Sequence, residues 1–355
     1  MDMESSHLDS QADVEAVDRS RMHKVLRSFP YQLEKGWELG SRSEKHFDKP
    51  PTILILGMGG SAIGGDLLST IVRENGRGQV IVNRSYDLPT FERDTIAVLA
   101  VSYSGNTEET ISTAEKAHER ALPMITISSG GKLQELSSKW GIQHIKIPSG
   151  YQPRAALGLM LGTIMHLADI WGNCAVAGKI MDAIQDVRNT VLSVSLETPL
   201  ANNKAKRIAV SLGTRTPIIV TSADISSVAE RMKTQFNENA KRLAWTVIMP
   251  EGNHNDWIPL MVDDRLKDYV GLSIARKSGN TLLERRMKIV YEKLSSRMRV
   301  ETIDWPDMPF ISSLLSTVIV GDYISYYTAL LSDIDPTPVE PIEEFKRLLA
   351  AKGGR

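Results

Sequence analysis

The sequence predicts an α/β fold of two tandem units, each with a mostly parallel sheet flanked by helices. Short apolar, β-branched segments alternate with longer segments of helical periodicity, which is typical of a parallel sheet covered on both faces. The 355 residues also exceed the ~100–200 of a typical single domain. Because the alternation restarts after a long predicted helix at 179–197, we expect two units of similar construction.

The first half opens its sheet with the apolar segment 52–56 (TILIL), which suits a strand buried on both faces. This segment stops at Gly57, and apolar residues then recur at helical spacing from 61 to 74. The same order of strand, loop and helix is repeated further along. The strands predicted in this half are 52–56, 80–83, 95–101, 124–128 and 144–147, and the helices are 61–74, 107–120, 132–140 and 154–171.

The second half repeats this alternation after the helix at 179–197. No close sequence repeat relates the two halves, so their expected likeness lies in the order of the elements. The strands predicted here are 216–221, 246–249, 269–275 and 298–303, and the helices are 227–242, 280–296, 309–331 and, at the end of the chain, 339–351.

The chain is therefore expected to divide into four segments. The polar, acidic start lacks a strong apolar period, so its first part is predicted to be frayed and an ordered helix to span about 20–37. The predicted segments are an N-terminal helical segment at 1–40, a first unit at 41–178, a second unit at 179–335 and a C-terminal helix at 336–355.

Composition excludes several classes of protein. With 42 basic and 43 acidic residues, the chain has no global charge that would recruit nucleic acid or an anionic membrane. Its single cysteine, Cys174, rules out an intrachain disulfide and is expected to be a buried thiol. No segment approaches the ~18 uninterrupted apolar residues of a membrane span, and the acidic start is unlike a targeting peptide. We therefore expect a cytoplasmic protein.

The loop Gly57 to Ser61 in GMGGSAIGGD has the features of an anion site. Its glycines permit positive φ and close backbone approach, and the helix that follows directs free N–H groups toward the loop. The spacing does not match the dinucleotide fingerprint G-x-G-x-x-G, so a nucleotide site is disfavoured. We interpret Gly64 and Gly65 as packing residues between the helix and the sheet.

A second loop, Ser102 to Thr107, also ends an apolar strand and opens a helix. It offers three hydroxyls, on Ser102, Ser104 and Thr107, and hydroxyls with helix N-terminal amides bind a phosphate monoester without a lysine. Alternatively, Asn106 or Thr107 only caps the helix. Two such loops at adjacent strand ends favour phosphate binding.

The chain resembles the bifunctional phosphoglucose/phosphomannose isomerase family over nearly its whole length. The motifs that carry the resemblance are GMGGSAIGGD, SYSGNTEET, YQPRAALG, QFNENAKR, EGNHND and DIDPTPVEPIEEFKRLL. The resemblance implies two tandem sugar isomerase domains, a C-terminal helix that contributes to the active site, and an enzyme that needs neither metal nor cofactor. The phosphate-binding residues it implies are Gly60, Ser61, Ser102, Ser104 and Thr107.

Interconversion of an aldose phosphate and a ketose phosphate needs a base that moves a proton between C1 and C2, and a cation near the enediolate. Glu238 is the candidate base, because the amides of Asn237 and Asn239 would hold its carboxylate without neutralising it in an ion pair. An ordinary exposed helix glutamate is the alternative. Arg154 is the candidate cation, and a surface arginine at a helix start is its alternative, although that end of the helix dipole disfavours it.

Ring opening is assigned through the resemblance to His254 in EGNHND and Lys346 in EEFKRLL. The family's histidine reaches across a dimer interface, so the resemblance implies a homodimer with shared active sites. From the sequence alone, Lys346 is equally well explained by an ion pair with Glu343. Thr337 could leave room for the intermediate to rotate about its C2–C3 bond, which acceptance of both glucose 6-phosphate and mannose 6-phosphate requires.

Two other functions stay open at this point. One is an isomerase of another phosphosugar, such as a seven-carbon or aminated sugar. The other is a non-catalytic sugar-phosphate-binding regulator, although neither a helix-turn-helix nor a basic segment is visible.

Overall fold

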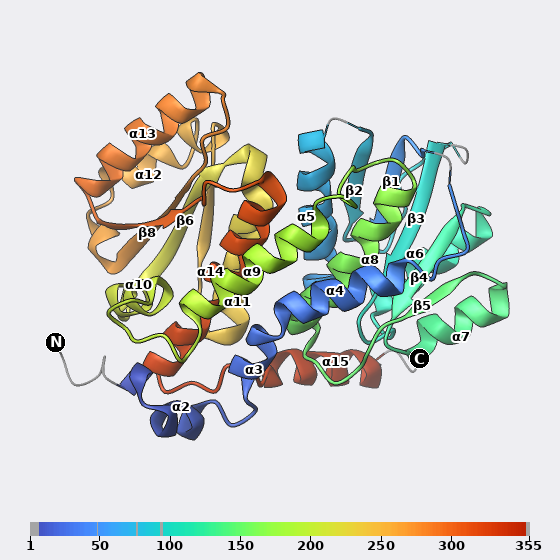
Figure 1. The fold of residues 1–355 in the computed structure, drawn as a ribbon, viewed down its shortest axis with the longest axis horizontal. Coiled ribbons are helices and arrows are strands. Elements are labelled where there is room, and N and C mark those ends of the chain that lie inside the picture. The colour runs from blue at the N-terminus through green and yellow to red at the C-terminus, as the bar shows by residue number, and fades with distance from the viewer. Residues whose placement is uncertain (1–6, 48, 76, 93–94, 353–355) are drawn as a thin grey trace.

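The computed structural model describes residues 7–47, 49–75, 77–92 and 95–352. Two separate sheets occupy opposite ends of the molecule, with helices of both halves between them (Figure 1). Every pairing in both sheets is parallel. The predicted α/β fold with two mostly parallel sheets is confirmed.

Sheet A contains five strands in the order β2-β1-β3-β4-β5. Its strands are β1 (Thr52–Leu56), β2 (Gln79–Asn83), β3 (Ile96–Val101), β4 (Met124–Ser128) and β5 (His144–Lys146). The helices of this half are α5 (Gly59–Asn75), α6 (Glu108–Glu119), α7 (Gly131–Trp140), η3 (Pro153–Ala156) and α8 (Leu157–Ile170). The chain reverses its direction of travel across the sheet between β1 and β3, so their carboxyl ends flank a crevice, where ligands bind in open α/β sheets.

Sheet B contains four strands in the order β7-β6-β8-β9, which repeats the first four positions of sheet A. Its strands are β6 (Thr216–Ser222), β7 (Trp245–Met249), β8 (Tyr269–Ala275) and β9 (Arg299–Asp304). The helices of this half are α10 (Lys204–Leu212), η4 (Ala223–Ile225), α11 (Ser226–Asn239), η5 (Glu251–Asn253), α12 (Trp257–Val262), η6 (Asp264–Asp268), α13 (Thr281–Ser295) and α14 (Phe310–Leu331).

The N-terminal helices differ from the prediction of a frayed start and one helix at 20–37. The structure has η1 (His7–Asp9), α2 (Gln11–Val17), α3 (Met22–Arg27) and α4 (Phe29–Gly40). The side chain of Ser10 caps α2, and Val14 is buried, so this segment is ordered by packing that its weak periodicity did not indicate. The break between α3 and α4 falls at Ser28, two residues before Pro30, whose ring favours a helix start. The first six residues lie outside the described part of the chain.

Two short helices, α10 and α12, were not predicted. Asn203 caps α10 by accepting a hydrogen bond from the Lys206 amide, and Ile208 and Leu212 are buried on its inner face. That spacing is helical, so the signal was present and was obscured by the charged and amide residues at its start.

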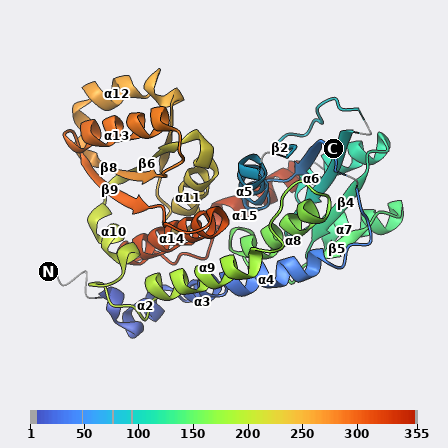
Figure 2. The same cartoon turned by 45° about the horizontal axis from the view of Figure 1, so that its top comes forward.

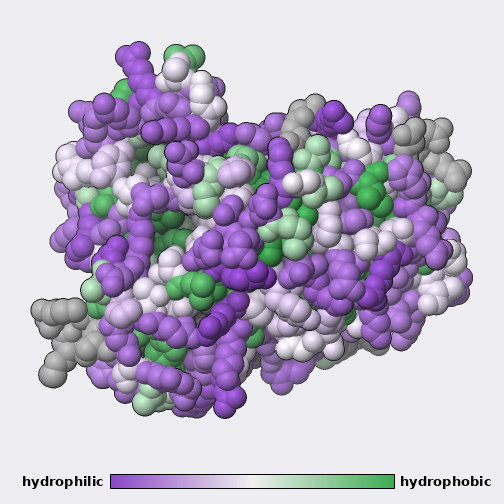
Figure 3. Space-filling view, viewed as in Figure 1, coloured by the Kyte–Doolittle hydropathy of each residue, from purple (hydrophilic) through white to green (hydrophobic). Residues whose placement is uncertain are grey.

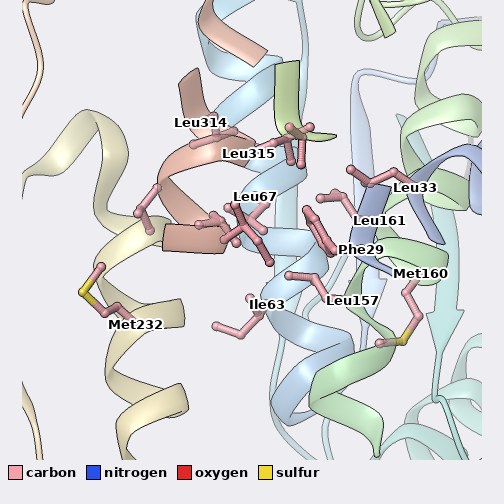
Figure 4. Packing of buried hydrophobic residues seen from close by; sticks show 14 of the residues in the cluster. Phe29, Leu33, Ile63, Leu67, Leu157, Met160, Leu161, Met232, Leu314 and Leu315 are labelled. Carbon is pink, nitrogen blue, oxygen red and sulfur yellow. The ribbon is translucent and has the colours of Figure 1, made fainter. Parts of the chain in front are cut away.

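One apolar core runs through both halves of the molecule. Figure 4 shows side chains from the two halves, including Leu33, Leu67, Leu157 and Leu314, gathered in this core. α4 crosses α8 closely, since a Cβ added to Gly36 would lie 2.3 Å from the carbonyl oxygen of Leu159. α9 (Ile180–Val194) connects the halves and runs alongside α4 (Figure 2).

α14 is long and apolar enough by composition to cross a membrane, but 83% of its apolar window is buried inside the molecule. It packs against α9, α10 and α11, as a core helix does. The outer surface on the face seen in Figure 3 is largely hydrophilic, with apolar residues in small separate patches. The last helix, α15 (Glu340–Lys352), lies on the outside of the molecule, and its residues from Glu340 to Leu349 are exposed.

Candidate active site

The two predicted phosphate loops lie side by side at the crevice of sheet A. One follows β1 and opens α5, and the other follows β3 and opens α6, and these two strands are neighbours. The backbone N–H of Tyr103 donates to Ser61 Oγ at 3.3 Å, so a hydrogen bond joins the two loops directly. The sheet order therefore brings together the residues that the sequence placed in one site.

The loop after β3 forms a cluster of hydroxyls beside an open helix end. Ser102 Oγ lies 2.9 Å from Thr107 Oγ1 and accepts from the Gly105 amide. Thr107 is the N-cap residue of α6, but its side chain makes no capping bond, and Asn106 Oδ1 accepts from the Lys132 amide instead. The alternative that these residues merely cap the helix is wrong, because neither side chain caps α6. Its first amides are left for an anion.

The loop after β1 approaches Arg154 through Gly60. A Cβ added to Gly60 would lie 2.9 Å from the Cα of Arg154, so only glycine permits this contact between main chains. Gly65 is also confirmed as a packing residue, since a Cβ there would lie 2.9 Å from Val82 Cγ2. Gly64 is different, because its nearest neighbour would be 3.6 Å away, and packing does not require a glycine there.

Arg154 is buried, which excludes the alternative of a surface arginine. Its Nε donates to Asn239 Oδ1 at 2.8 Å, and its Nη2 donates to the carbonyls of Pro336 and Thr337 at 2.7 and 3.1 Å. Nη1 lies 3.4 Å from Glu238 Oε2. Burial lowers the pKa of Arg154, and the charge of Glu238 opposes this fall. An arginine remains charged in any case, so the site holds a fixed cation.

Glu238 lies in the last turn of α11, with a quarter of its side chain exposed. The expectation that amides would hold it without an ion pair is wrong. Asn239 directs its side chain to Arg154 and Ser325, and in the described chain no hydrogen bond joins Asn237 to Glu238. Arg154 is the partner that the structure gives Glu238. A carboxylate that is partly exposed and faces a buried cation can accept and return a proton.

Lys241 fixes the backbone around this carboxylate. Its Nζ donates to four carbonyls: those of Glu238 and Asn239 at the end of α11, and those of Asp335 and Pro336 in the turn that precedes α15. Burial lowers the pKa of Lys241 to about 8 and Arg154 adds to the shift, whereas four carbonyl acceptors favour the charged ammonium. Lys241 belongs to the motif QFNENAKR, but the sequence alone gave it no role.

His254 does not lie near Glu238 within one chain. It is exposed and follows β7 at the carboxyl edge of sheet B. α11 begins beside that same edge and runs back across the sheet, and its 14 residues span roughly 20 Å. Glu238 is therefore separated from His254 by about the length of this helix.

Lys346 lies on the exposed helix α15, where the described residues give it no ion pair with Glu343 or with any other acid. The alternative of a structural pair with Glu343 is therefore not observed. Among the contacts of the described residues, none joins Lys346 to Glu238, so its role rests on the resemblance.

A cleft of about 410 Å³ lies between α5 and α11 and reaches the loop after β1 at Gly59. Among the described residues of the predicted phosphate loops, Gly59 alone lines it. The rest of the lining is largely polar, and includes an ion pair of Asp66 with Arg84. Burial raises the pKa of Asp66. We place the candidate site at the two loops, Arg154 and Glu238, which converge outside this cleft.

Comparison with known proteins agrees with this arrangement. Residues 201–349 match the family model of the bacterial phospho-glucose isomerase C-terminal SIS domain. A bifunctional phosphoglucose/phosphomannose isomerase of Caldicellulosiruptor bescii is 34% identical over 341 residues, which cover 93% of this chain and 99% of the relative. A D-glucosamine-6-phosphate 4-epimerase of Sulfolobus acidocaldarius is 33% identical over 206 residues, which cover 58% of this chain and 62% of that relative.

Among solved structures, a hypothetical protein of Thermus thermophilus has a TM-score of 0.75 to this chain. The two share 15% of their residues, and the match covers 97% of this chain and 94% of the other. At this level of identity the likeness concerns the fold alone.

Proposed function

Because this chain belongs to the bifunctional phosphoglucose/phosphomannose isomerase family and is a sugar-phosphate isomerase, we propose that it works through a cis-enediol intermediate and without a metal. Its substrates are glucose 6-phosphate and mannose 6-phosphate, each interconverted with fructose 6-phosphate. The observation that carries the mechanism is the carboxylate of Glu238 facing the buried guanidinium of Arg154, beside two open phosphate loops.

In the proposed reaction the phosphate of the substrate binds to Gly60, Ser61, Ser102, Ser104 and Thr107. Glu238 removes the proton from C2 of the open-chain aldose and returns it to C1, while a proton passes from O2 to O1. Arg154 offsets the negative charge that develops on the enediolate oxygens. Since this charge is stabilised by a fixed cation, the chemistry does not require a Lewis acid. Rotation of the intermediate about C2–C3, for which Thr337 leaves room, lets one base serve both aldoses.

The most direct test replaces Glu238 with Gln, which keeps the shape of the side chain and removes the base. We expect turnover of both aldose phosphates to fall by about 10⁴-fold or more, while binding of a non-reacting phosphate ester is retained. A coupled assay measures both reactions, with and without a chelator. Persistent turnover by the Glu238→Gln protein would eliminate Glu238 as the base, and loss of wild-type activity in chelator would contradict the metal-free reaction.

We further propose that the enzyme is a cytoplasmic homodimer in which His254 completes the partner's active site and, with Lys346 on α15, assists ring opening. The separation of His254 from Glu238 supports this proposal. Exposed apolar side chains support it as well, since Ile258 and Val262 lie on α12 just after His254, and Phe345 lies on α15. We also retain the division into domains at 41–178 and 179–335, with α15 as a part of the site.

Mixing two inactive variants tests the shared site. One carries Glu238→Gln and the other His254→Ala, and each is expected to be inactive alone. If the histidine comes from the partner, a mixed dimer has one site with both native residues, and re-association of an equal mixture restores about a quarter of wild-type activity. If both residues act within one chain, mixing restores none.

The likeness to the D-glucosamine-6-phosphate 4-epimerase favours one second candidate, which is chemistry on an aminated sugar phosphate. The same protein incubated with glucosamine 6-phosphate, followed by chromatography of the sugar products, tests it. We expect no product, because the family members that match the whole chain are named as isomerases of phosphoglucose and phosphomannose.

A further inference from the structure

We infer that Asn239 is a positioning residue for Arg154, and that the buried pair of Arg231 and Asp322 holds the same arginine by its main chain. This inference rests on the proposed role of Arg154 beside the enediolate. The sequence assigns no role to Arg231 or Asp322, and the role it predicts for Asn239, holding the Glu238 carboxylate, differs from the contact with Arg154 that the structure shows. They lie on α11 and α14, behind the site rather than in it.

Asn239 connects the reactive guanidinium to the core. Its Oδ1 accepts from Arg154 Nε at 2.8 Å, and its Nδ2 donates to Ser325 Oγ at 3.0 Å. Ser325 in turn donates to the carbonyl of Asp322 on α14. Asn239 is 1% exposed and Ser325 is fully buried, so no solvent competes for these bonds. The amide has one orientation in which both bonds form, and this orientation is set from α14.

Arg231 holds Arg154 by its main chain. Its Nη2 donates to the main-chain carbonyl of Arg154 at 2.9 Å, while its Nε and Nη2 bind both carboxylate oxygens of Asp322 at 3.0 and 2.7 Å. Burial raises the pKa of Asp322, and the charge of Arg231 acts in the opposite direction. A buried ion pair contributes little net stability compared with apolar residues of similar volume. What this pair provides is a fixed position for the main chain of Arg154.

The hydrogen bonds of Arg154 show which of its donors stay available for the substrate. A guanidinium has five N–H donors. The Nε donor is taken by Asn239, and the two Nη2 donors are taken by the carbonyls of Pro336 and Thr337. Only Nη1 remains, and it faces Glu238. Arg154 therefore presents its Nη1 edge to the Glu238 carboxylate. The same edge faces the space beside that carboxylate, where the enediolate oxygens would form.

Asn239 is therefore expected to act on the chemical step through Arg154 without touching the substrate. Removing its acceptor frees Arg154 Nε and lets the guanidinium move away from Glu238. The developing negative charge then loses its nearest cation.

The experiment compares Asn239→Ala with a matched control, Asn203→Ala, by steady-state kinetics. Asn203 is also buried, and its side-chain amide donates to the Ser195 carbonyl and accepts from the Lys206 backbone N–H, but it makes no contact with Arg154. For Asn239→Ala we expect kcat to fall roughly 10- to 100-fold with KM changed less than about threefold. For Asn203→Ala we expect lower thermal stability with kcat unchanged.

The variant Ser325→Ala is a second test that the fold should tolerate easily. It removes only the hydroxyl that orients the amide of Asn239, so we expect a smaller fall in kcat, again with KM changed less than about threefold. If Asn239→Ala does not yield folded protein, Ser325→Ala decides the question.

The inference is overturned if kcat of Asn239→Ala stays within threefold of the wild type, if KM rises by as large a factor as kcat falls, or if Asn203→Ala loses as much activity. Wild-type turnover in the same assay distinguishes a failure of the positioning role from a failure of the proposed function. An inactive wild type would reject the proposed function, whereas an active wild type with an unaffected Asn239→Ala would reject the positioning role alone.

Discussion

The loops after β3 and β8 share the sequence Ser-Gly-Asn-Thr and hold the same position in their sheets, but only the second has a side chain that caps its helix. They comprise Ser104 to Thr107 in sheet A and Ser278 to Thr281 in sheet B. Both glycines have positive φ, +70° at Gly105 and +77° at Gly279. In both loops the serine hydroxyl accepts a hydrogen bond from the backbone N–H of the asparagine at 3.2 Å. This short repeat was not recognised from the sequence.

The contacts of the two asparagines differ. In sheet A the side chain of Asn106 turns away to the Lys132 amide, so no side chain caps α6. In sheet B the side chain of Asn280 caps α13 through the Leu283 amide, and Glu284 accepts from the Gly279 amide. The helix end in sheet B is therefore occupied by side chains of the protein itself.

The position two residues before the shared sequence differs as well. Sheet A has Ser102, whose hydroxyl joins the cluster with Thr107. Sheet B has Arg276, which pairs with Glu74 at 2.7 Å and Asp224 at 3.3 Å and lies over the ring of Phe310. At the same topological position, sheet A thus has a helix end without a side-chain cap, and sheet B has an arginine that joins the two halves. A helix end can bind an anion where no side chain caps it, so the shared motif alone does not make an anion site.

The largest expected difference between the loops comes from Gly105→Ala and Gly279→Ala. A Cβ on Gly105 would lie 1.8 Å from the carbonyl oxygen of Gly130, whereas nothing lies within 4 Å of a Cβ on Gly279. Both variants incur about 1–2 kcal/mol of strain from positive φ, but Gly105→Ala must also displace the neighbouring loop. We expect kcat/KM to fall about 100-fold or more for Gly105→Ala and to change little for Gly279→Ala. Equal losses in the two variants would show that both loops shape the site.

Thr107→Val and Thr281→Val compare the hydroxyls of the two loops. We expect Thr107→Val to raise KM and the inhibition constant of inorganic phosphate about tenfold, since a hydrogen bond to a charged group contributes about 1.5–3 kcal/mol. Thr281→Val should leave both constants within twofold of the wild type. A higher inhibition constant in Thr281→Val would place a phosphate at sheet B instead.

Arg276→Ala tests whether the sheet B crevice is structural. The Arg276 side chain is 10% exposed and its partners are partly exposed, so we expect a loss of about 1 kcal/mol in the free energy of unfolding. This loss is measured by urea denaturation. KM for fructose 6-phosphate is expected to stay at the wild-type value, and a rise as large as that of Thr107→Val would contradict the assigned role.

The smallest expected effect concerns His144 on β5, a strand for which sheet B has no counterpart among the described residues. His144 Nδ1 lies 2.8 Å from Thr126 Oγ1, and Nε2 lies 3.4 Å from Ser128 Oγ, which donates to the Gly130 carbonyl under the phosphate loop. Burial lowers the pKa of His144 below 6.5, and Lys146 adds to the shift. The unfolded chain therefore binds this proton more readily than the folded chain.

Stability from His144 is accordingly complete above about pH 6.5 and is lost as the pH falls toward the lower pKa of the folded state. We expect the melting temperature of His144→Gln to fall less than that of the wild type between pH 7.5 and pH 5. Parallel pH profiles of the two proteins would show that His144 does not titrate in this way.

Much of the fold and of the phosphate site follows from local sequence. Strands such as TILIL, the glycines after β1 and the hydroxyls after β3 are signals within a few residues of one another, and parallel strand order brings their ends together. The N-terminal helices were predicted less well, because the order of α2 comes from tertiary burial of Leu8 and Val14 rather than from periodicity.

The surroundings of the candidate catalytic residues were decided only by tertiary structure. The sequence indicated Arg154 and Glu238 through their motifs, but it predicted amide partners for Glu238 and gave no sign of Asp322. The contacts that set the site join residues far apart in the chain, such as Arg154 and the Pro336 carbonyl, which are 182 residues apart. The sequence by itself determined the helix ends and glycine turns of the candidate phosphate site, because these signals are local. The packing of α11 and α14 against the first half determined where Arg154 and Glu238 face each other, because no local pattern encodes a contact between distant helices.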